Sequence, residues 1–489
     1  MSLSRIKELS KHAVIYGIGS VAQSALGFIL LPVLTSKMSE AEFGAYSLIF
    51  VSVTIASAIF FLGMTSALPR SYFDYPEDQE RRSIFTTGLV ILISGAMLQI
   101  ALGYFAGALI AKALLHSNDK IYITGIFWGF FGGALSFIVQ YFFSYLRLNR
   151  LSISSVIFSL ASVVLGVLLT LTFLNNGEDT LIAPFKAIAY TQIIMGILFL
   201  LIYGKRALSI QIKLSEAKPL VKFGIGTIFT SFGVMALDWA DRFIIEGYTN
   251  LSDVGSYSAA SRVSGIMAVL LVTPFAQIWS PMMHEYRSNV HIKRFTENVF
   301  SLYIMAGGVL VAFISLFATE ILSYMIKFPI DQRMIFVFMI LSVATIANGT
   351  NNIVVAGIFY ERKIFLLPII YYAFAIIKFG LNLFLIPIFG VMAAAFNTLI
   401  ISIFLPWAVY VVSCKFFKFK IEINRLSKFI PIIIVPIFIG IAFPIQGNPY
   451  IHIAARLLLL CLIIVALLFF CLLPDEKHRL KIFLKTIRG

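Results

Sequence analysis

The chain has 489 residues, of which 60% are hydrophobic and only 12% are charged, and its mean hydropathy is +0.95. Soluble domains carry roughly 25% charged residues, so this composition excludes a soluble protein and indicates a polytopic membrane protein. The formal net charge of +15 requires no nucleic acid, because anionic lipid headgroups attract the same basic residues.

About fourteen segments are apolar over the roughly 20 residues that a helix needs to cross the hydrocarbon. They are too long and too uniformly apolar for barrel strands, which alternate over about ten residues. We therefore predict an all-α membrane protein with about 14 transmembrane helices. The expected spans are 13–36, 43–69, 84–111, 121–146, 152–174, 181–203, 221–247, 254–280, 296–318, 333–358, 364–386, 389–413, 428–445 and 450–473.

Most of the 38 Lys and Arg residues lie in alternate segments between these spans. Cytoplasmic loops carry the excess of basic residues, so this alternation predicts that both termini are cytoplasmic. No loop is longer than about twenty residues, which leaves no room for a soluble catalytic domain.

The first and the seventh spans begin with one repeated pattern. Residues 17–20 read Gly-Ile-Gly-Ser and are followed by Glu-Phe-Gly-Ala-Tyr-Ser at 42–47. Residues 224–227 read Gly-Ile-Gly-Thr and are followed by Asp-Val-Gly-Ser-Tyr-Ser at 253–258. The second copy differs because charged residues lie within the apolar span that follows its glycines. A long membrane chain that repeats itself halfway is typical of a two-lobed transporter.

Arg150 and Arg362 extend the correspondence between the two copies. Each copy holds six spans, so both begin on the same side of the membrane and the repeat is parallel. We predict an N-terminal six-helix lobe, a linker, a C-terminal six-helix lobe, and two extra helices with a basic tail, in residues 1–203, 204–222, 223–413 and 414–489.

Enzyme and metal signatures are missing from the sequence, which has no Walker loop, no His-Glu-x-x-His and no Cys-x-x-Cys. The three cysteines lie in or beside late spans, where buried apolar thiols are expected. We predict no catalytic residue, no metal site and no cofactor, and we leave coupling to H⁺ or Na⁺ open.

Charged residues inside the spans are the sharpest functional signal, because an ionised side chain at the bilayer centre costs about 2.5 to 3.5 kcal/mol. Asp238 and Arg242 lie four residues apart on one helical face, where an ion pair would form, and Asp241 shares part of that face. The helical rise puts Asp238 and Arg262 at similar depths, roughly 13 and 12 Å. One interpretation is a closed salt-bridge cluster that only locks two helices together. The other is a partly cationic, water-filled cavity whose Arg groups bind an anionic substrate, since guanidinium fits phosphate bidentately.

Two further cations have open roles. Lys378 shares a helical face with Asn382 and either lines a cavity or snorkels to the membrane surface. Arg70 follows Pro69 at the predicted cytoplasmic end of the second span, where it is either a group at the cavity entrance or an interfacial anchor.

Short motifs across the whole chain resemble the polysaccharide exporters of the multidrug/oligosaccharidyl-lipid/polysaccharide (MOP) superfamily, and Wzx-type repeat-unit (O-antigen) flippases in particular. The motifs are Gly17-Ile18-Gly19-Ser20, Glu42-Phe43-Gly44-Ala45-Tyr46-Ser47, Leu62-Gly63-Met64 with Arg70-Ser71-Tyr72-Phe73, Asp241-Arg242-Phe243, and Leu381-Asn382-Leu383-Phe384-Leu385-Ile386-Pro387 with Gly390.

This resemblance implies a MATE-like two-lobed fold in which the first, second, seventh and eighth helices line a central cavity. It implies a flippase that moves an undecaprenyl-pyrophosphate-linked oligosaccharide from the cytoplasmic to the outer leaflet of the bacterial inner membrane by alternating access. The implied partners are this lipid-linked oligosaccharide, membrane lipids and other polysaccharide assembly proteins. The substrate-binding candidates that it carries over are Arg70, Asp238, Asp241, Arg242, Arg262 and Lys378.

Three alternatives remain. A lipid II flippase of the MurJ type is poorly separated by the sequence. A cation-coupled multidrug antiporter often has a titratable carboxylate inside its N-terminal lobe, whereas here residues 13–68 hold Glu40 and Glu42 only at an external loop. A membrane glycan polymerase or ligase usually carries a sizeable outer loop, and the outer loops of this chain are short and nearly uncharged.

Overall fold

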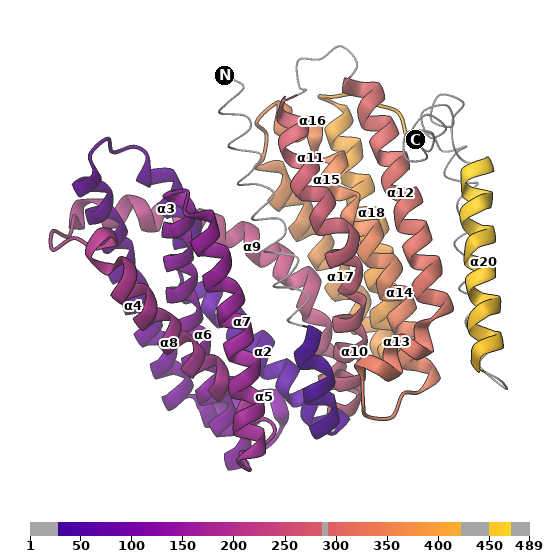
Figure 1. Cartoon of the computed structure of the whole chain (residues 1–489), viewed down its shortest axis with the longest axis horizontal. Coiled ribbons are helices and arrows are strands. Elements are labelled where there is room, and N and C mark those ends of the chain that lie inside the picture. The colour runs from indigo at the N-terminus through magenta and orange to yellow at the C-terminus, as the bar shows by residue number, and fades with distance from the viewer. Residues whose placement is uncertain (1–27, 286–291, 422–448, 471–489) are drawn as a thin grey trace, which may run out of the picture. The chain divides into compact units, whose positions relative to one another are not determined.

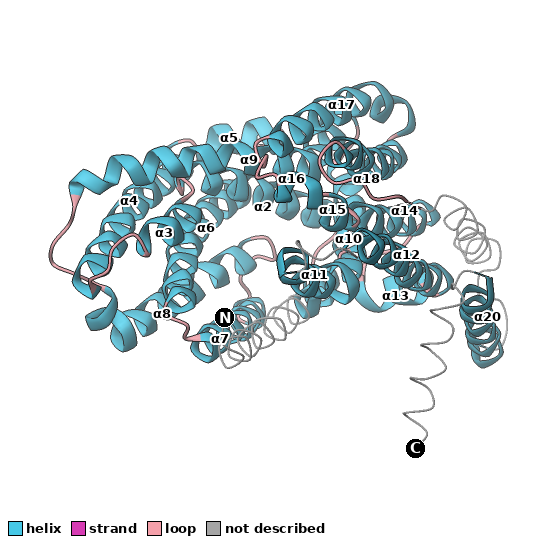
Figure 2. Cartoon of the chain, turned by 90° about the horizontal axis from the view of Figure 1, so that it is seen from above, coloured by secondary structure: helices cyan, strands magenta, loops and turns pink. Residues whose placement is uncertain are grey.

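The computed structural model describes residues 28–285, 292–421 and 449–470. Within these ranges every regular element is a helix (Figure 1, Figure 2), which confirms the predicted all-α fold class. The repeated motif at 17–20 and the predicted span 428–445 lie outside the described residues.

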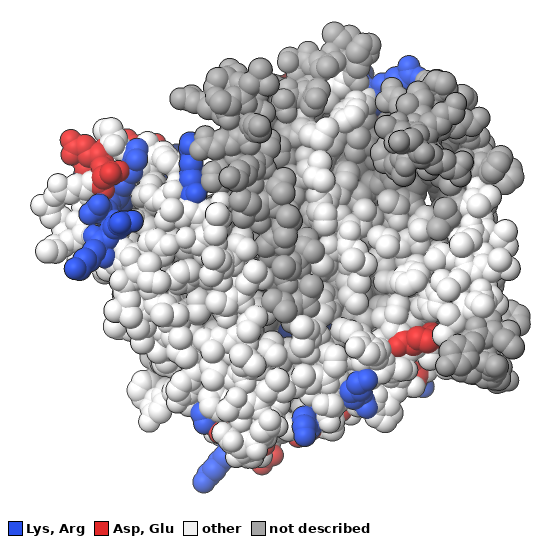
Figure 3. Space-filling model, viewed as in Figure 1, with Lys and Arg blue, Asp and Glu red and all other residues white. Residues whose placement is uncertain are grey.

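In the described part of the chain, ten helical segments are long and apolar enough to cross a membrane, and the bent helix α9 is an eleventh. They correspond one by one to the predicted spans from 43–69 to 389–413. On the face drawn in Figure 3, charged side chains of the described residues lie near the helix ends and leave a broad uncharged band between them. The chain is therefore a multi-pass membrane protein.

The helices belong to two compact units, and the described residues of the first are 28–259, 326–329 and 367–397. Its helices are α2 (Glu40–Phe60), α3 (Met64–Tyr72), α4 (Asp78–Phe105), α5 (Gly107–Leu115), α6 (Lys120–Leu148), α7 (Ser152–Asn175), α8 (Ile182–Ala207), α9 (Leu214–Tyr248), most of α10 (Leu251–Ser264) and nearly all of α17 (Leu366–Phe389).

The second unit holds the other described helices, together with the last part of α10 and most of α18. They are a π-helical turn (Ala268–Val272), α11 (Thr273–Glu285), α12 (Ile292–Leu316), α13 (Ala318–Met325), α14 (Gln332–Gly349), α15 (Asn351–Val354), α16 (Ala356–Tyr360), α18 (Val391–Cys414) and α20 (Pro449–Phe470). The predicted lobe boundaries do not coincide with these units, and the residue bounds of the lobes stay a prediction.

An aromatic core joins α4, α6 and α8 in the first unit. Phe142 stacks on Phe199 with ring centroids 4.3 Å apart, and Phe85 stacks on Tyr141 at 4.8 Å. The hydroxyl of Tyr141 donates a hydrogen bond to the backbone carbonyl of Phe85 at 3.0 Å. Buried aromatic pairs of this kind stabilise the packing of α4, α6 and α8 beyond the contribution of burial alone.

The repeat inferred from the sequence has a counterpart in the backbone. Arg150 and Arg362 both adopt a left-handed conformation, with φ of 58° and 55°. Each lies just beyond a helix, α6 or α16, and the amide of the next residue reaches back five residues: Leu151 to Leu146 at 2.9 Å, and Lys363 to Ile358 at 2.9 Å. Non-glycine residues seldom adopt this conformation, so its recurrence at matched positions supports a duplicated origin.

The glycines of the repeated motif meet one another where α2 and α10 begin. A Cβ atom on Gly44 would overlap the carbonyl oxygen of Leu251, and a Cβ atom on Gly255 would overlap that of Glu40. The contact is reciprocal, because Glu40 and Gly44 correspond to Leu251 and Gly255 in the repeat. Only glycine permits so close a backbone approach.

A second close approach lies at the other end of the same span. Gly63, at the break between α2 and α3, has φ of 62°, and it packs against Gly224 of α9. A Cβ atom on Gly224 would overlap the carbonyl oxygen of Leu62. The two glycine contacts are separated by roughly 28 Å along the span.

We expect Gly44→Ala to lower the thermal unfolding midpoint of the purified protein in detergent, because the added methyl group forces apart two backbones at a cost of about 1 to 3 kcal/mol. Gly380→Ala in α17 is the matched control, since an added Cβ meets no atom within 4 Å there. Equal midpoints for the two variants would contradict the contact between α2 and α10.

Candidate functional site

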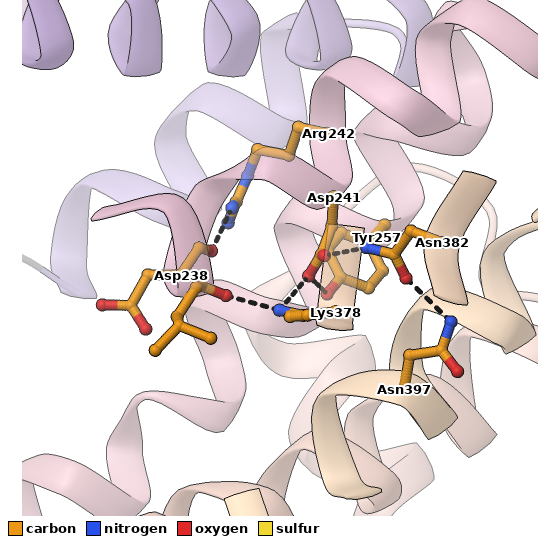
Figure 4. Close-up of polar contacts among 8 residues, drawn as sticks. Asp238, Asp241, Arg242, Tyr257, Lys378, Asn382 and Asn397 are labelled. Atoms are coloured by element: carbon orange, nitrogen blue, oxygen red, sulfur yellow. Dashed lines mark hydrogen bonds and ion pairs between the residues drawn. The ribbon is translucent and has the colours of Figure 1, made fainter. Parts of the chain in front are cut away.

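A buried polar cluster in the first unit centres on the carboxylate of Asp241 in α9 (Figure 4). Its Oδ2 accepts a hydrogen bond from the Tyr257 hydroxyl of α10 at 2.7 Å and forms an ion pair with the Lys378 Nζ of α17 at 2.8 Å. Its Oδ1 accepts from the Asn382 Nδ2 at 2.6 Å. Asp241 and Lys378 are only 1% and 2% exposed, so the ion pair is closed off from its surroundings.

The cluster extends through amide groups to α18. Asn397 donates from Nδ2 to the Oδ1 of Asn382 at 2.8 Å, and the Lys378 ammonium also donates to the backbone carbonyl of Leu237. Besides its counterion, Asp241 therefore has two hydrogen-bond partners, Tyr257 and Asn382, and Lys378 has the carbonyl of Leu237. A buried ion pair is tolerated only when its remaining donors and acceptors are satisfied in this way.

Arg242 is buried beside this cluster, between α9 and α10. Its Nε donates to the Ser258 Oγ at 3.1 Å, and its Nη1 donates to the backbone carbonyl of Asp238 at 3.1 Å. The guanidinium carbon lies 5.8 Å from the centre of the Tyr257 ring. The structure therefore shows a hydrogen bond from Arg242 to the main chain of Asp238 in place of the expected ion pair between their side chains. The Arg242 side chain turns toward α10, where it reaches Ser258.

Asp238 differs from its charged neighbours in exposure. Its carboxylate points away from Asp241 and Lys378 in Figure 4, and the residue is exposed. Ser231 and Val234, which precede it by seven and four residues on the same helical face, are exposed as well. The Asp238 carboxylate therefore lies outside the cluster and is accessible, whereas that of Asp241 is enclosed.

The two remaining candidates lie elsewhere. Arg70 is exposed on α3, and its guanidinium carbon lies 4.3 Å from the centre of the Phe223 ring of α9. Arg262 is partly buried on α10, one helical turn beyond Ser258, and belongs to the second unit. The structure thus brings together Asp241, Arg242 and Lys378, and it shows Lys378 as half of a buried ion pair, without snorkelling.

Tyr257 and Asn397 were not among the predicted site residues. A signal for Tyr257 existed, because it belongs to the second copy of the repeated motif. Its counterpart Tyr46 packs against the Phe185 ring at 5.0 Å, whereas Tyr257 donates to Asp241. The tyrosine of the repeated motif thus packs in an aromatic core in the first copy and donates a hydrogen bond to a carboxylate in the second.

The helical spans and the buried charges between them define a multi-pass membrane protein with a polar cluster inside its helix bundle. The family model described as polysaccharide biosynthesis protein matches residues 9–287, and the chain belongs to this family. The succinoglycan biosynthesis transport protein ExoT of Rhizobium meliloti (strain 1021) is 28% identical over 271 residues, which are 53% of this chain and 51% of ExoT. That match spans about half the length of the curated relative.

Solved structures extend the similarity over nearly the whole chain. A lipid II flippase MurJ in an inward closed conformation has a TM-score of 0.74 at 15% identity, covering 92% of this chain and 97% of that one. A multidrug resistance MATE family transporter of the MOP superfamily, inward-facing, has a TM-score of 0.64 at 12% identity, covering 81% and 94%. At these identities the likeness concerns the fold, and it confirms the MATE-like two-lobed architecture expected from the sequence.

We expect Asp241→Asn and Lys378→Met each to destabilise the protein by about 3 to 5 kcal/mol, because each leaves one buried charge without its partner. The double variant should recover much of this loss, since neither member of the pair is left as an unpaired charge. Thermal unfolding in detergent of the wild type, both single variants and the double variant gives the coupling energy. Additive single effects would show that Asp241 and Lys378 do not act as a pair.

Proposed function

We propose that this protein is a flippase that moves an undecaprenyl-pyrophosphate-linked oligosaccharide from the cytoplasmic to the outer leaflet of the bacterial inner membrane. The observation that carries the proposal is that a chain of the polysaccharide biosynthesis protein family has the fold of a lipid II flippase over 92% of its length. Both termini are cytoplasmic in this proposal, in line with the distribution of basic residues.

Alternating access is the proposed mechanism, because folds built from membrane repeats open to one side by moving one repeat against the other. The reciprocal contact of Gly44 with Gly255 and the contact of Gly63 with Gly224 support it. Both contacts join helices of the two sequence copies at points of close backbone approach, where one repeat can move against the other.

The substrate-facing residues in this proposal are Asp238, Arg70 and Arg262. Asp238 and Arg70 are exposed and Arg262 is partly buried, and an arginine fork suits a phosphate group. We assign Asp241, Arg242 and Lys378 to positioning instead, because they are buried in contacts with other helices. The sequence analysis placed all six residues in a single cationic cavity, and this proposal separates them into two groups.

Deletion of the gene in its own bacterium tests the proposed function. We expect lipid-linked oligosaccharide to accumulate in the inner membrane and surface glycan to disappear, with restoration by the wild-type chain. Altered drug susceptibility with normal surface glycan would favour a cation-coupled multidrug antiporter. Arrested peptidoglycan synthesis would favour a lipid II flippase, and glycan extension by the purified protein would favour a polymerase or ligase.

We expect Asp238→Asn and Arg262→Gln to reduce surface glycan at least about tenfold, as losing a charge-assisted contact to a bound substrate does, while the protein level in the membrane stays normal. Tyr104→Phe, at an exposed position of α4, is the control and should export normally. Quantitative glycan staining and immunoblots of membranes provide the measurement. Normal glycan from both variants would remove Asp238 and Arg262 from the substrate path.

A further inference from the structure

A histidine and a glutamate join helices of the two sequence copies at one end of the first unit. The Nε2 of His116, which ends α5, lies 3.4 Å from the Oε1 of Glu246 in the last turn of α9. By the sequence repeat α5 belongs to the first copy and α9 to the second, and both helices lie in the first unit. The two side chains form an ion pair when the imidazole is protonated.

The two side chains differ in their access to water. The His116 side chain is 69% exposed and can exchange protons with solvent, whereas that of Glu246 is only 11% exposed. Leu115 and Ile245, which directly precede them in the chain, are buried, so the backbone on both sides of the contact is packed. A charge on the imidazole therefore acts on a carboxylate that water screens only in part.

This pair lies at the same end of the unit as the reciprocal glycine contact. Glu246 is near the end of α9, and α10 begins soon after at Leu251, whose carbonyl oxygen lies against Gly44 of α2. A close approach of two backbones does not respond to pH, because it contains no titratable group. His116 and Glu246 therefore add a titratable contact to an end of the unit that is otherwise held by backbone packing.

The other charged groups at this end have been compared with His116 as partners of Glu246. The last turns of α4 and α17 carry no charged residue. The segments that do carry them contribute Lys112 on α5, Asp119 and Lys120 at the start of α6, Glu40 and Glu42 on α2, and Asp253 on α10. Among the described residues, His116 is the ionisable group that acts electrostatically on the Glu246 carboxyl.

We infer that His116 and Glu246 form a pH-sensitive latch, in which protonation of His116 holds α5 against α9 at this end of the unit. Histidine changes its charge between about pH 5 and pH 8, so the attraction is present in acid and weakens as the pH rises. The proposed topology places this end on the outer face of the membrane. The effect of the latch on transport rests on the proposed flippase function: acid outside the cytoplasm would slow the opening of this end.

Spin-label distances in the purified full chain test the latch without transport. The three native cysteines are replaced by serine, and labels are attached at Leu109→Cys on α5 and Tyr248→Cys on α9, which are both exposed positions. From pH 8 to pH 5.5 the fraction of molecules with separated labels should fall about threefold, as expected for an ion pair with one exposed partner. A control pair at Leu109→Cys and Ile121→Cys, within the first copy, should not respond to pH.

Two substitutions of His116 separate its charge from its backbone conformation. His116 has φ of 48°, which asparagine also accepts, so His116→Asn should keep the separated fraction at its pH 8 value throughout. His116→Arg keeps a positive charge in a conformation that Arg150 and Arg362 also adopt, and it should keep the pH 5.5 value throughout.

A separated fraction that does not change with pH in the wild type would overturn the latch, as would a pH response that persists in His116→Asn or in Glu246→Gln. Thermal unfolding of the same variants identifies any that fail to fold, and the wild type should exceed His116→Asn in unfolding midpoint at pH 5.5 but not at pH 8. The expected pH response, combined with normal surface glycan in the deletion strain, would refute the flippase function and leave the latch standing.

Discussion

One buried carboxylate organises the helices that bear the charged residues of this protein. Asp241 accepts hydrogen bonds or an ion pair from Tyr257, Lys378 and Asn382, which lie on α10 and α17, while it is itself carried by α9. Three helices therefore have their rotation about their own axes fixed by the same two oxygen atoms. Asp238, three residues before Asp241 on α9, lies outside the cluster and is exposed.

The same contacts explain why Asp238 and Asp241, only three residues apart, differ in their surroundings. A buried ion pair gains little net stability, yet losing one partner is severe because the other charge stays in a medium of low dielectric. Asp241 and Lys378 are bound to each other by this asymmetry and cannot exchange partners with a passing substrate at low cost. Arg70 is in no such ion pair among the described residues; it is exposed and lies over the Phe223 ring.

Local chemistry was predictable from the sequence, and long-range pairing was not. Hydropathy placed the eleven described spans because the hydrocarbon core imposes a length on every helix. The spacing of Asp238 and Arg242 indicated an ion pair, whereas the guanidinium donates to the main-chain carbonyl of Asp238. Lys378 lies 137 residues from Asp241, and only the packing of α9 against α17 joins them. The contact of Arg70 with the Phe223 ring likewise depends on where α3 crosses α9.

The reciprocal glycines have a further consequence for how such a chain can arise and change. A contact in which Gly44 meets the segment around Leu251 while Gly255 meets the segment around Glu40 has the symmetry of a dimer interface between two identical copies. If the two halves were separate, identical chains encoded by one gene, a single glycine codon would supply both glycines of this contact. After fusion the glycine is encoded twice, so a bulky substitution in either copy is enough to break an interface that belongs to both.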